Sequence, residues 1–109
     1  MQNDEIPAIP GEDVTLTANV LKAMAHPLRW NILCTLGDQE LSVGEIVERV
    51  GTSQSNISQH LEQLRNKNIV VSRRDANRIF YSVRNDEVRK LIETMRKVLC
   101  KANLEDHYG

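Results

Sequence analysis

The sequence of 109 residues has few aromatic residues, two cysteines and no long apolar run. With one Trp, one Phe and two Tyr, a core must come from Leu, Ile and Val, and small cores are often completed by oligomerisation. The cysteines stand 66 positions apart with no Cys-x-x-Cys motif, which excludes a zinc knuckle and a thioredoxin motif. No stretch is long enough to cross a bilayer and the N-terminus does not resemble a secretory signal, so we expect a cytoplasmic protein with no membrane partner.

Charge is unevenly distributed along the chain, although the formal net charge is only −1. Residues 1–13 hold four acids and no base, together with two prolines and a glycine, which predicts a flexible acidic tail. Residues 53–90 hold eight Lys or Arg against four Asp or Glu, a net charge of +4. A local positive field is what phosphate recognition requires. The expected organisation is this tail, one domain over residues 14–103 and a short C-terminal tail over residues 104–109.

Residues 41–64 predict two short helices joined by a tight turn. Ser42 and Glu45 match the Ser-x-x-Glu capping box that begins a helix, and Gly51 suits the left-handed residue that ends it. A second helix is predicted over residues 54–64. Its apolar residues recur at i, i+4 and i+7 and form one buried stripe of Ile57, Leu61 and Leu64.

The other side of this second helix carries uncharged hydrogen-bonding side chains, where a solvated helix usually carries Lys and Glu. Amides and hydroxyls match the donor and acceptor patterns of base edges in the major groove. The pattern predicts a helix-turn-helix whose second helix enters DNA; the alternative is a polar helix of a small bundle with solvated amides. The candidate DNA-binding residues are Ser53 on the phosphate side and, toward the bases, Gln54, Ser55, Asn56, Ser58, Gln59 and His60.

Two runs rich in β-branched and aromatic residues, 69–74 and 79–83, flank a turn composition and predict a β-hairpin. Arg73, Arg74 and Arg78 cluster at its tip. A lone hairpin is marginally stable, but packed behind a helix-turn-helix it forms a wing. Its arginines would then bind phosphates or enter a minor groove, and the alternative is a solvated hairpin end.

The remaining helices are predicted over residues 14–25, from Pro27 to Gly37, and over residues 86–102. The apolar stripe of the last helix continues for four turns and is wider than one small domain can cover. We therefore expect a homodimer through the first and last helices, which presents two recognition helices to an inverted-repeat DNA operator. The expected fold class is mainly α with a small β-hairpin, a winged helix-turn-helix with five helices and a DNA-binding and dimerisation role.

This order of elements resembles the ArsR/SmtB family of winged-helix transcriptional regulators over residues 16–103. The stretches that carry the resemblance are residues 21–29, 32–33, 40–45, 53–61 and 80–82. The resemblance implies a transcription regulator, not an enzyme. It also implies a homodimer that represses an operator and releases DNA when an inducer, commonly a metal ion, binds.

The metal sites of that family are not matched in this sequence. Members with a site on the helix before the recognition helix have Cys-x-Cys where this chain has Ser42 and Gly44. Members with a site across the paired last helices have Asp and His near the start and two His near the end. The corresponding residues here are Asn85, Glu87, Val98 and Lys101. Soft and borderline ions require thiolate and imidazole, so we expect no metal and no other cofactor.

The cysteine pair matches the thiol-switch branch of the family, the BigR, SqrR and HlyU type, which has a cysteine at each of the positions of Cys34 and Cys100. The resemblance implies a repressor that forms a di- or polysulfide bridge between these cysteines within one subunit. The inducer would be a reactive sulfur species or another oxidant, and bridging would release DNA. Lys97 and Lys101 flank Cys100, so we expect Cys100 to react first and Cys34 to resolve.

Four alternatives stay open at this point. The chain could resemble HlyU in activating transcription by displacing a silencing protein. It could be a metalloregulator with an unrecognised site, for instance one built from Cys100 and His107. It could be a thiol peroxidase or sulfurtransferase, although no base adjoins either cysteine in the sequence. Finally, both cysteines could be small buried packing residues in a regulator without an inducer.

Overall fold

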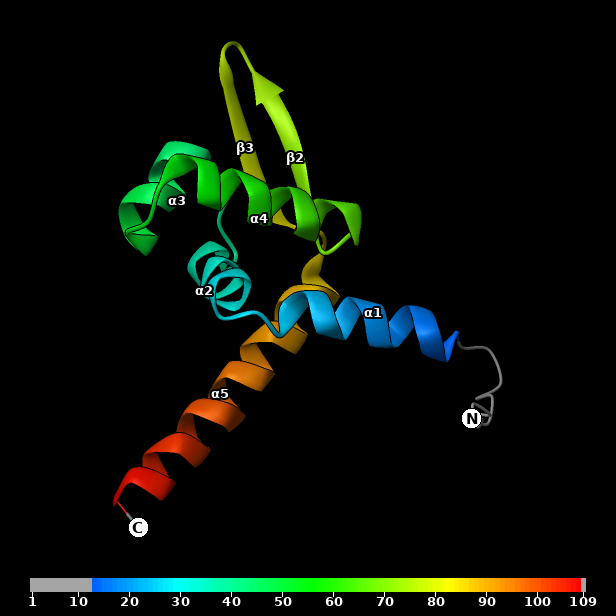
Figure 1. Cartoon of the computed structure of the whole chain (residues 1–109), viewed down its shortest axis with the longest axis vertical. Coiled ribbons are helices and arrows are strands. Elements are labelled where there is room, and N and C mark those ends of the chain that lie inside the picture. Colours follow the sequence, from blue (N-terminus) through cyan, green and yellow to red (C-terminus); the bar gives the residue numbers. More distant parts are fainter. Residues whose placement is uncertain (1–12, 109) are drawn as a thin grey trace.

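The computed structural model describes residues 13–108, with side chains described for residues 13–100. Within that part the elements are α1 (Val14–Met24), α2 (Pro27–Leu36), β1 (Leu41–Ser42), α3 (Val43–Val50), α4 (Gln54–Asn66), β2 (Val70–Asp75), β3 (Arg78–Val83) and α5 (Asp86–Tyr108). The β2–β3 hairpin projects from one end of the molecule and α5 extends from the other (Figure 1). The predicted five helices and wing are confirmed, whereas the predicted tail over residues 1–12 lies outside the described residues.

The first two helices begin where a side chain accepts a hydrogen bond from an unpaired backbone amide. Asp13 accepts from the Leu16 amide at 3.0 Å, and His26 Nδ1 accepts from the Leu28 amide at 3.1 Å. Pro27 occupies the first position of α2, where its missing N–H has no cost. These local signals explain why the helix starts could be predicted from the sequence.

The wing belongs to a three-stranded antiparallel sheet of order β1–β3–β2. The two-residue strand β1 was not predicted; it pairs Leu41 with Tyr81 and Ser42 with Phe80. Tyr81 and Leu41 are buried, so one face of the sheet packs on the core. Because successive residues of a strand alternate between faces, Ser42 and Phe80 lie on the opposite face.

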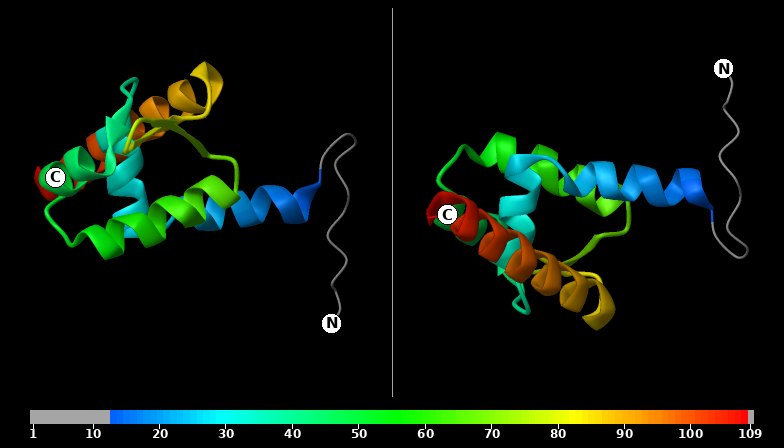
Figure 2. Two further views of the ribbon diagram at one scale, coloured as in Figure 1. Left: turned by 90° about the horizontal axis from the view of Figure 1, so that it is seen from above. Right: turned by 90° about the horizontal axis from the view of Figure 1, so that it is seen from below.

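Helix α2 occupies the centre of the molecule, between α4 and α5 (Figure 2), and contacts both. The buried hydrophobic residues are Ala23, Met24, Ile32, Leu33, Leu36, Leu41, Ile46, Ile57, Leu61, Leu64, Ile69, Val70, Tyr81 and Ile92. The core therefore consists almost entirely of aliphatic side chains, as the scarcity of aromatics required. Because α2 contacts both α4 and α5, a shift of α2 would displace both of these helices.

The helix and strand boundaries differ slightly from the predictions. Helix α5 continues to Tyr108, beyond its predicted end at residue 102, because no Gly or Pro interrupts residues 103–108. Residues 104–108, predicted as a tail, are therefore helical. Helix α4 extends two residues further than predicted, and α1 ends one residue earlier.

Candidate DNA-binding interface and thiol pair

Helices α3 and α4 have the geometry of a helix-turn-helix. The capping box of α3 is complete, because the Ser42 amide donates to Glu45 Oε1 at 2.8 Å and the Glu45 amide donates to Ser42 Oγ at 3.2 Å. Gly51 ends α3 in the left-handed region, with φ of 86°, which a side chain would disfavour. In α4 the predicted stripe of Ile57, Leu61 and Leu64 is fully buried, with 0% exposure at each residue. This burial fixes which face of α4 points outward.

The outward face of α4 carries four of the predicted base-reading side chains, and all four are exposed: Gln54, Ser55, Ser58 and Gln59. Asn56 is half-buried, and its Nδ2 donates to Thr52 Oγ1 at 3.2 Å. The Ser53 hydroxyl caps the helix by accepting from the Asn56 amide at 3.1 Å. The exposed amides and hydroxyls thus remain available to base edges, while Asn56 and Ser53 are engaged in holding the start of α4.

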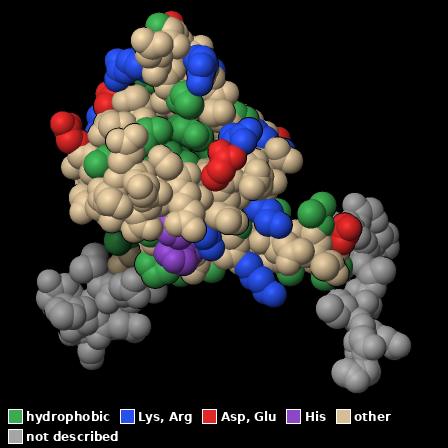
Figure 3. All heavy atoms as spheres, turned by 45° about the horizontal axis from the view of Figure 1, so that its top comes forward, with side chains coloured by type: hydrophobic (Ala, Val, Ile, Leu, Met, Phe, Trp, Pro, Cys, Tyr) green, Lys and Arg blue, Asp and Glu red, His purple; other side chains and the backbone are tan. Residues whose placement is uncertain are grey.

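His60 differs from the other predicted base-reading residues, because its side chain turns toward α2. Arg29 Nη1 lies 3.1 Å from His60 Nδ1, and since arginine only donates, His60 accepts. Arg29 Nε also donates to the Ala23 carbonyl oxygen at 2.6 Å. The ring of His60 lies on that of His26, with centroids 4.5 Å apart. The histidines form one surface patch (purple in Figure 3). This geometry argues against a base contact by His60 and makes it part of the junction between α4 and α2.

The environment of His60 favours its neutral form. Burial lowers the pKa of the imidazole, and the nearby His26 and Arg29 lower it further. A neutral ring is what the contact requires, because Nδ1 can accept from Arg29 only while it is unprotonated.

The wing arginines have different surroundings. Arg73 forms two hydrogen bonds with the Glu40 carboxylate, at 2.8 and 2.7 Å, and Arg78 donates to Ser42 Oγ at 3.1 Å. Both guanidinium groups lie over the Phe80 ring, each 5.0 Å from its centroid. Arg74 is exposed and has no ion-pair partner among the described side chains. Basic side chains flank the hairpin tip in Figure 3.

Cys34 lies half-buried on α2, where it faces α5. It lines a small cavity of about 70 Å³ together with Arg89, Ile92, Glu93 and Arg96. Burial raises the pKa of the Cys34 thiol, Arg96 opposes that effect, and the nearby Cys100 thiol adds to it. Cys100 is exposed and lies one turn after Arg96 on the same helix. The sequence analysis did not identify Arg96 as a neighbour of the thiols, although its position four residues before Cys100 places it on the same side of the helix.

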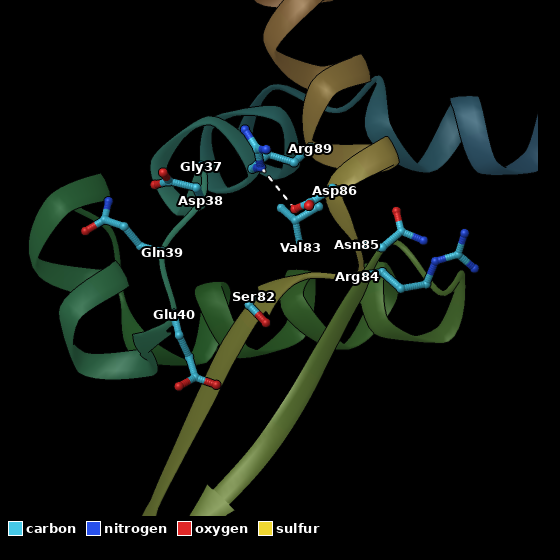
Figure 4. Close-up of a pocket in the computed structure, with 10 residues that line it drawn as sticks. All are labelled: Gly37, Asp38, Gln39, Glu40, Ser82, Val83, Arg84, Asn85, Asp86 and Arg89. Carbon is cyan, nitrogen blue, oxygen red and sulfur yellow. Dashed lines mark ion pairs between the residues drawn. The ribbon is translucent and has the colours of Figure 1, made fainter.

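A polar cavity of about 540 Å³ adjoins this region, between the loop after α2 and the junction of β3 with α5 (Figure 4). Of its two arginines, Arg84 and Arg89, the second turns toward Asp86, with which it forms an ion pair of 3.6 Å, and it also binds Glu93 at 3.0 Å. Because both acids pair with Arg89, this arginine is not free to bind an anion in the cavity.

A metal site is not formed by the described side chains: within residues 13–100 no group of three or more His, Cys, Asp and Glu side chains could hold an ion. The His107 side chain, named in the metalloregulator alternative, lies outside the described residues. No helix in the described part of the chain is sufficiently long and apolar to cross a membrane.

Helices α1 and α5 expose large apolar side chains at the end of the molecule opposite the wing. These are Leu16, Leu21, Leu91, Val98 and Leu99, each at least 50% exposed. Leu21 and Leu99 also line an apolar groove of about 450 Å³ between α1, α2 and α5. Exposed apolar patches of this kind mark interaction surfaces.

Comparison with known proteins identifies the family. The model of the arsR family of bacterial regulatory proteins matches residues 26–72. The transcriptional activator HlyU of Vibrio cholerae is 46% identical over 84 residues, which cover 77% of this chain and 78% of HlyU. The biofilm growth-associated repressor of Xylella fastidiosa is 34% identical over 104 residues, which cover 92% of this chain and 91% of the repressor. The chain belongs to the ArsR family.

Solved structures agree with this assignment. HlyU from V. cholerae superimposes with a TM-score of 0.76 at 41% identity, covering 83% of this chain and 98% of HlyU. A homodimeric winged helix-turn-helix domain from Mycobacterium bovis gives a TM-score of 0.74 at 26% identity, covering 93% and 98% of the two chains. This ArsR-family protein is therefore a DNA-binding transcriptional regulator with a winged helix-turn-helix, and it belongs to a family of regulators, not of enzymes.

Proposed function

We propose that this chain is a homodimeric repressor whose DNA affinity is controlled by a sulfur bridge between Cys34 and Cys100 of one subunit. The observation that carries the proposal is the packing of α2 against α5 beside Cys34, with Cys100 one turn beyond the Arg96 that lines the Cys34 cavity. Cys100 is the more exposed thiol and Cys34 the more buried, which suits an attacking and a resolving cysteine in that order.

The chemistry with a persulfide inducer, R–S–SH, proceeds by sulfur transfer. The Cys100 thiolate attacks the terminal sulfur, giving Cys100–S–SH and the donor thiolate RS⁻. Attack of the Cys34 thiolate on Sγ of Cys100 then forms a disulfide and expels hydrosulfide. If Cys34 has also received a sulfur, the Cys100 persulfide anion attacks Sγ of Cys34. This step forms a trisulfide and again expels hydrosulfide. Hydrogen peroxide would instead convert the two thiols into a disulfide and two waters.

The fold offers a route from this bridge to DNA. Helix α2 contacts α5 through the Cys34 side and contacts α4 on its other side (Figure 2). The Arg29–His60 hydrogen bond joins α2 directly to the DNA-reading helix. A dimer reads two half-sites that B-DNA holds about 34–36 Å apart, so a small rotation of α2 and α4 removes one half-site from register.

Homodimerisation is supported by the apolar surface of α1 and α5. Five large side chains there are at least half exposed, which is costly for an isolated chain and is relieved when a second copy covers them. The M. bovis domain that this chain resembles is homodimeric, which supports a dimer here without specifying its interface.

The proposal is tested by measuring the intact mass of the reduced protein after brief exposure to glutathione persulfide or to hydrogen peroxide. Loss of both free thiols after persulfide treatment is the expected result, with one added sulfur if the bridge is a trisulfide and none if it is a disulfide. Cys34→Ser and Cys100→Ser serve as matched controls, because each retains one thiol and cannot form the bridge. Persistence of two free thiols after both treatments would contradict the proposal.

A second candidate is activation of transcription, because the relative HlyU is a transcriptional activator at 46% identity. In that case the DNA-bound dimer would displace a silencing protein. Transcription from a bound promoter, measured with and without a nucleoid silencing protein, separates the two. A repressor lowers transcription in both reactions, whereas an activator of this kind raises it only when the silencer is present.

A further inference from the structure

One face of the wing sheet gathers acidic and basic side chains that the proposed function does not use. Glu40 stands just before β1 and holds Arg73 of β2 through two hydrogen bonds, at 2.8 and 2.7 Å. Figure 4 shows the Glu40 side chain directed along the sheet, away from the Arg89–Asp86 pair of the neighbouring cavity. The contact spans 33 positions in sequence and joins the hairpin to the chain that enters α3.

Arg78 is held on the same face by the start of α3. Its Nη2 donates to Ser42 Oγ at 3.1 Å and lies 3.9 Å from the Glu45 carboxylate. These two side chains already form the α3 capping box, so Arg78 binds the helix start itself. Phe80 lies under both arginines and is paired with Ser42 and Arg73 on the neighbouring strands. The cluster of Glu40, Ser42, Glu45, Arg73, Arg78 and Phe80 is called the wing anchor below.

The wing anchor contains more contacts than an ordinary surface ion pair, because it combines a bidentate ion pair with a network of neighbouring charges. Isolated exposed pairs contribute little to stability, but bidentate arginine–carboxylate pairs and networks are the exceptions. Stacking of both guanidinium groups on one ring adds a cation–π contribution. The hydrogen bonds from Arg73 lower the pKa of the Glu40 carboxyl, which keeps it ionised. A two-stranded hairpin without such contacts is only marginally ordered.

Arg74 occupies the other face of the hairpin. It pairs with Ile79 across the strands, one position out of phase with Arg73 and Phe80. In the described part of the chain Glu40, Ser42 and Glu45 make no contact with it. Arg74 is thus the wing arginine whose charge is available to an approaching phosphate.

We propose that Glu40 is a positioning residue for DNA binding: through the wing anchor it fixes the hairpin to the start of α3 and presents Arg74 to the DNA backbone. Arg73 and Arg78 serve the anchor in this scheme, and the phosphate contact is made by Arg74. The inference rests on the proposed placement of the wing against DNA and does not depend on the cysteine switch.

The test compares DNA affinity and its salt dependence for Glu40→Gln and Glu62→Gln in the full-length reduced protein. Glu62 of α4 forms a comparable exposed two-bond pair with Arg65 that is not part of the wing anchor, so both changes remove one acid and one bidentate pair. Glu40→Gln should weaken binding about twofold to fivefold relative to Glu62→Gln, the effect of losing a well-formed ion pair. A control for the wing itself is Arg74→Gln, which should reduce the salt dependence by about one phosphate contact.

A charge reversal completes the experiment. Glu40→Arg and Arg73→Glu should each weaken binding, and the double variant should recover most of the loss, because the pair is restored with its ends exchanged. Tighter binding by Glu40→Gln than by Glu62→Gln would overturn the inference, since Glu40 would then compete with phosphate for Arg73. An effect of Arg74→Gln without one of Glu40→Gln would also overturn it. No effect of either change would instead show that the wing does not touch DNA.

Discussion

The two ends of this molecule differ in how far a single chain buries its apolar side chains and pairs its charged ones. At the DNA-binding end, Ile57, Leu61 and Leu64 are fully buried and two of the three wing arginines are bound within the chain. At the opposite end, α1 and α5 leave apolar side chains such as Val98 and Leu99 more than half exposed. Figure 1 shows these ends pointing away from each other. The comparison indicates that one chain is sufficient to bury the apolar side of α4, whereas the end that carries Cys100 leaves an apolar surface that the proposed second subunit would cover.

The largest effect is expected from Leu99→Arg, which places a charge in the apolar groove of α1 and α5. The dimer should dissociate, and operator affinity should fall about a hundredfold or more because the two half-sites are no longer bound together. Sedimentation velocity and fluorescence anisotropy measure the two outcomes. The matched control is Val71→Arg, an exposed apolar residue of the hairpin, which should leave the protein dimeric. A persistent Leu99→Arg dimer would mean that another surface joins the subunits.

The next largest effect is expected on α4, the DNA-reading helix. Gln59→Ala removes an exposed amide from α4 and should cost about 1–3 kcal/mol of discrimination at one base pair of the operator. Affinity for random DNA should hardly change, because phosphate contacts supply nonspecific binding. Competition titrations against operator variants and random duplexes measure both quantities. An equal loss on every sequence would assign Gln59 to the backbone instead of the bases.

A smaller, kinetic effect is expected at the cysteine end. Arg96 lowers the pKa of Cys34 against the effect of burial, so Arg96→Gln should reduce the thiolate fraction of Cys34. Closure of the bridge should then slow about twofold to tenfold, since the thiolate fraction changes tenfold for each pKa unit. Quenched-flow alkylation followed by mass spectrometry gives the rate. Lys90→Gln removes the same charge from α5 ten residues before Cys100 and serves as the control. Equal slowing in Lys90→Gln would show that the rate depends on the overall charge of the helix.

The smallest effect concerns pH. Because the folded pKa of His60 lies below its ordinary value of 6.5, the neutral ring contributes stability in full above that value. This contribution is lost as the pH falls toward the folded pKa. Urea unfolding at pH 7.5 and 5.5 should show this acid destabilisation, and His60→Asn, which keeps an acceptor for Arg29 without titrating, should diminish it. An unchanged pH dependence in His60→Asn would show that His60 is not the group responsible for the acid destabilisation.

The sequence predicted the helix-turn-helix well because its signals are local. The Ser42–Glu45 capping box, the positive φ of Gly51 and the i, i+4, i+7 stripe all act within a few residues, and the structure contains each of them. The family resemblance was equally reliable, since most of its stretches lie within residues 26–72, which the family model matches. Only residues 21–25 and the wing stretch 80–82 lie outside that match.

Contacts between distant segments could not be predicted in the same way. A polar residue on α4 is compatible with a base contact or with an internal hydrogen bond, and only the fold shows that His60 meets Arg29, 31 positions earlier. Strand β1 has two residues, too few for any alternation to be visible. Its pairing with β3 brings Glu40 to Arg73, so the wing anchor could not be predicted from the sequence.

The most direct test of the account is the operator affinity of the reduced dimer compared with that of the same sample after persulfide treatment. Fluorescence anisotropy at fixed salt should show a loss of about 5- to 150-fold, the range expected for coupling between two sites. The loss should reverse with a thiol reductant and should be absent from Cys34→Ser and Cys100→Ser. An operator affinity that stays unchanged while mass spectrometry shows the bridge fully formed would contradict the proposed switch.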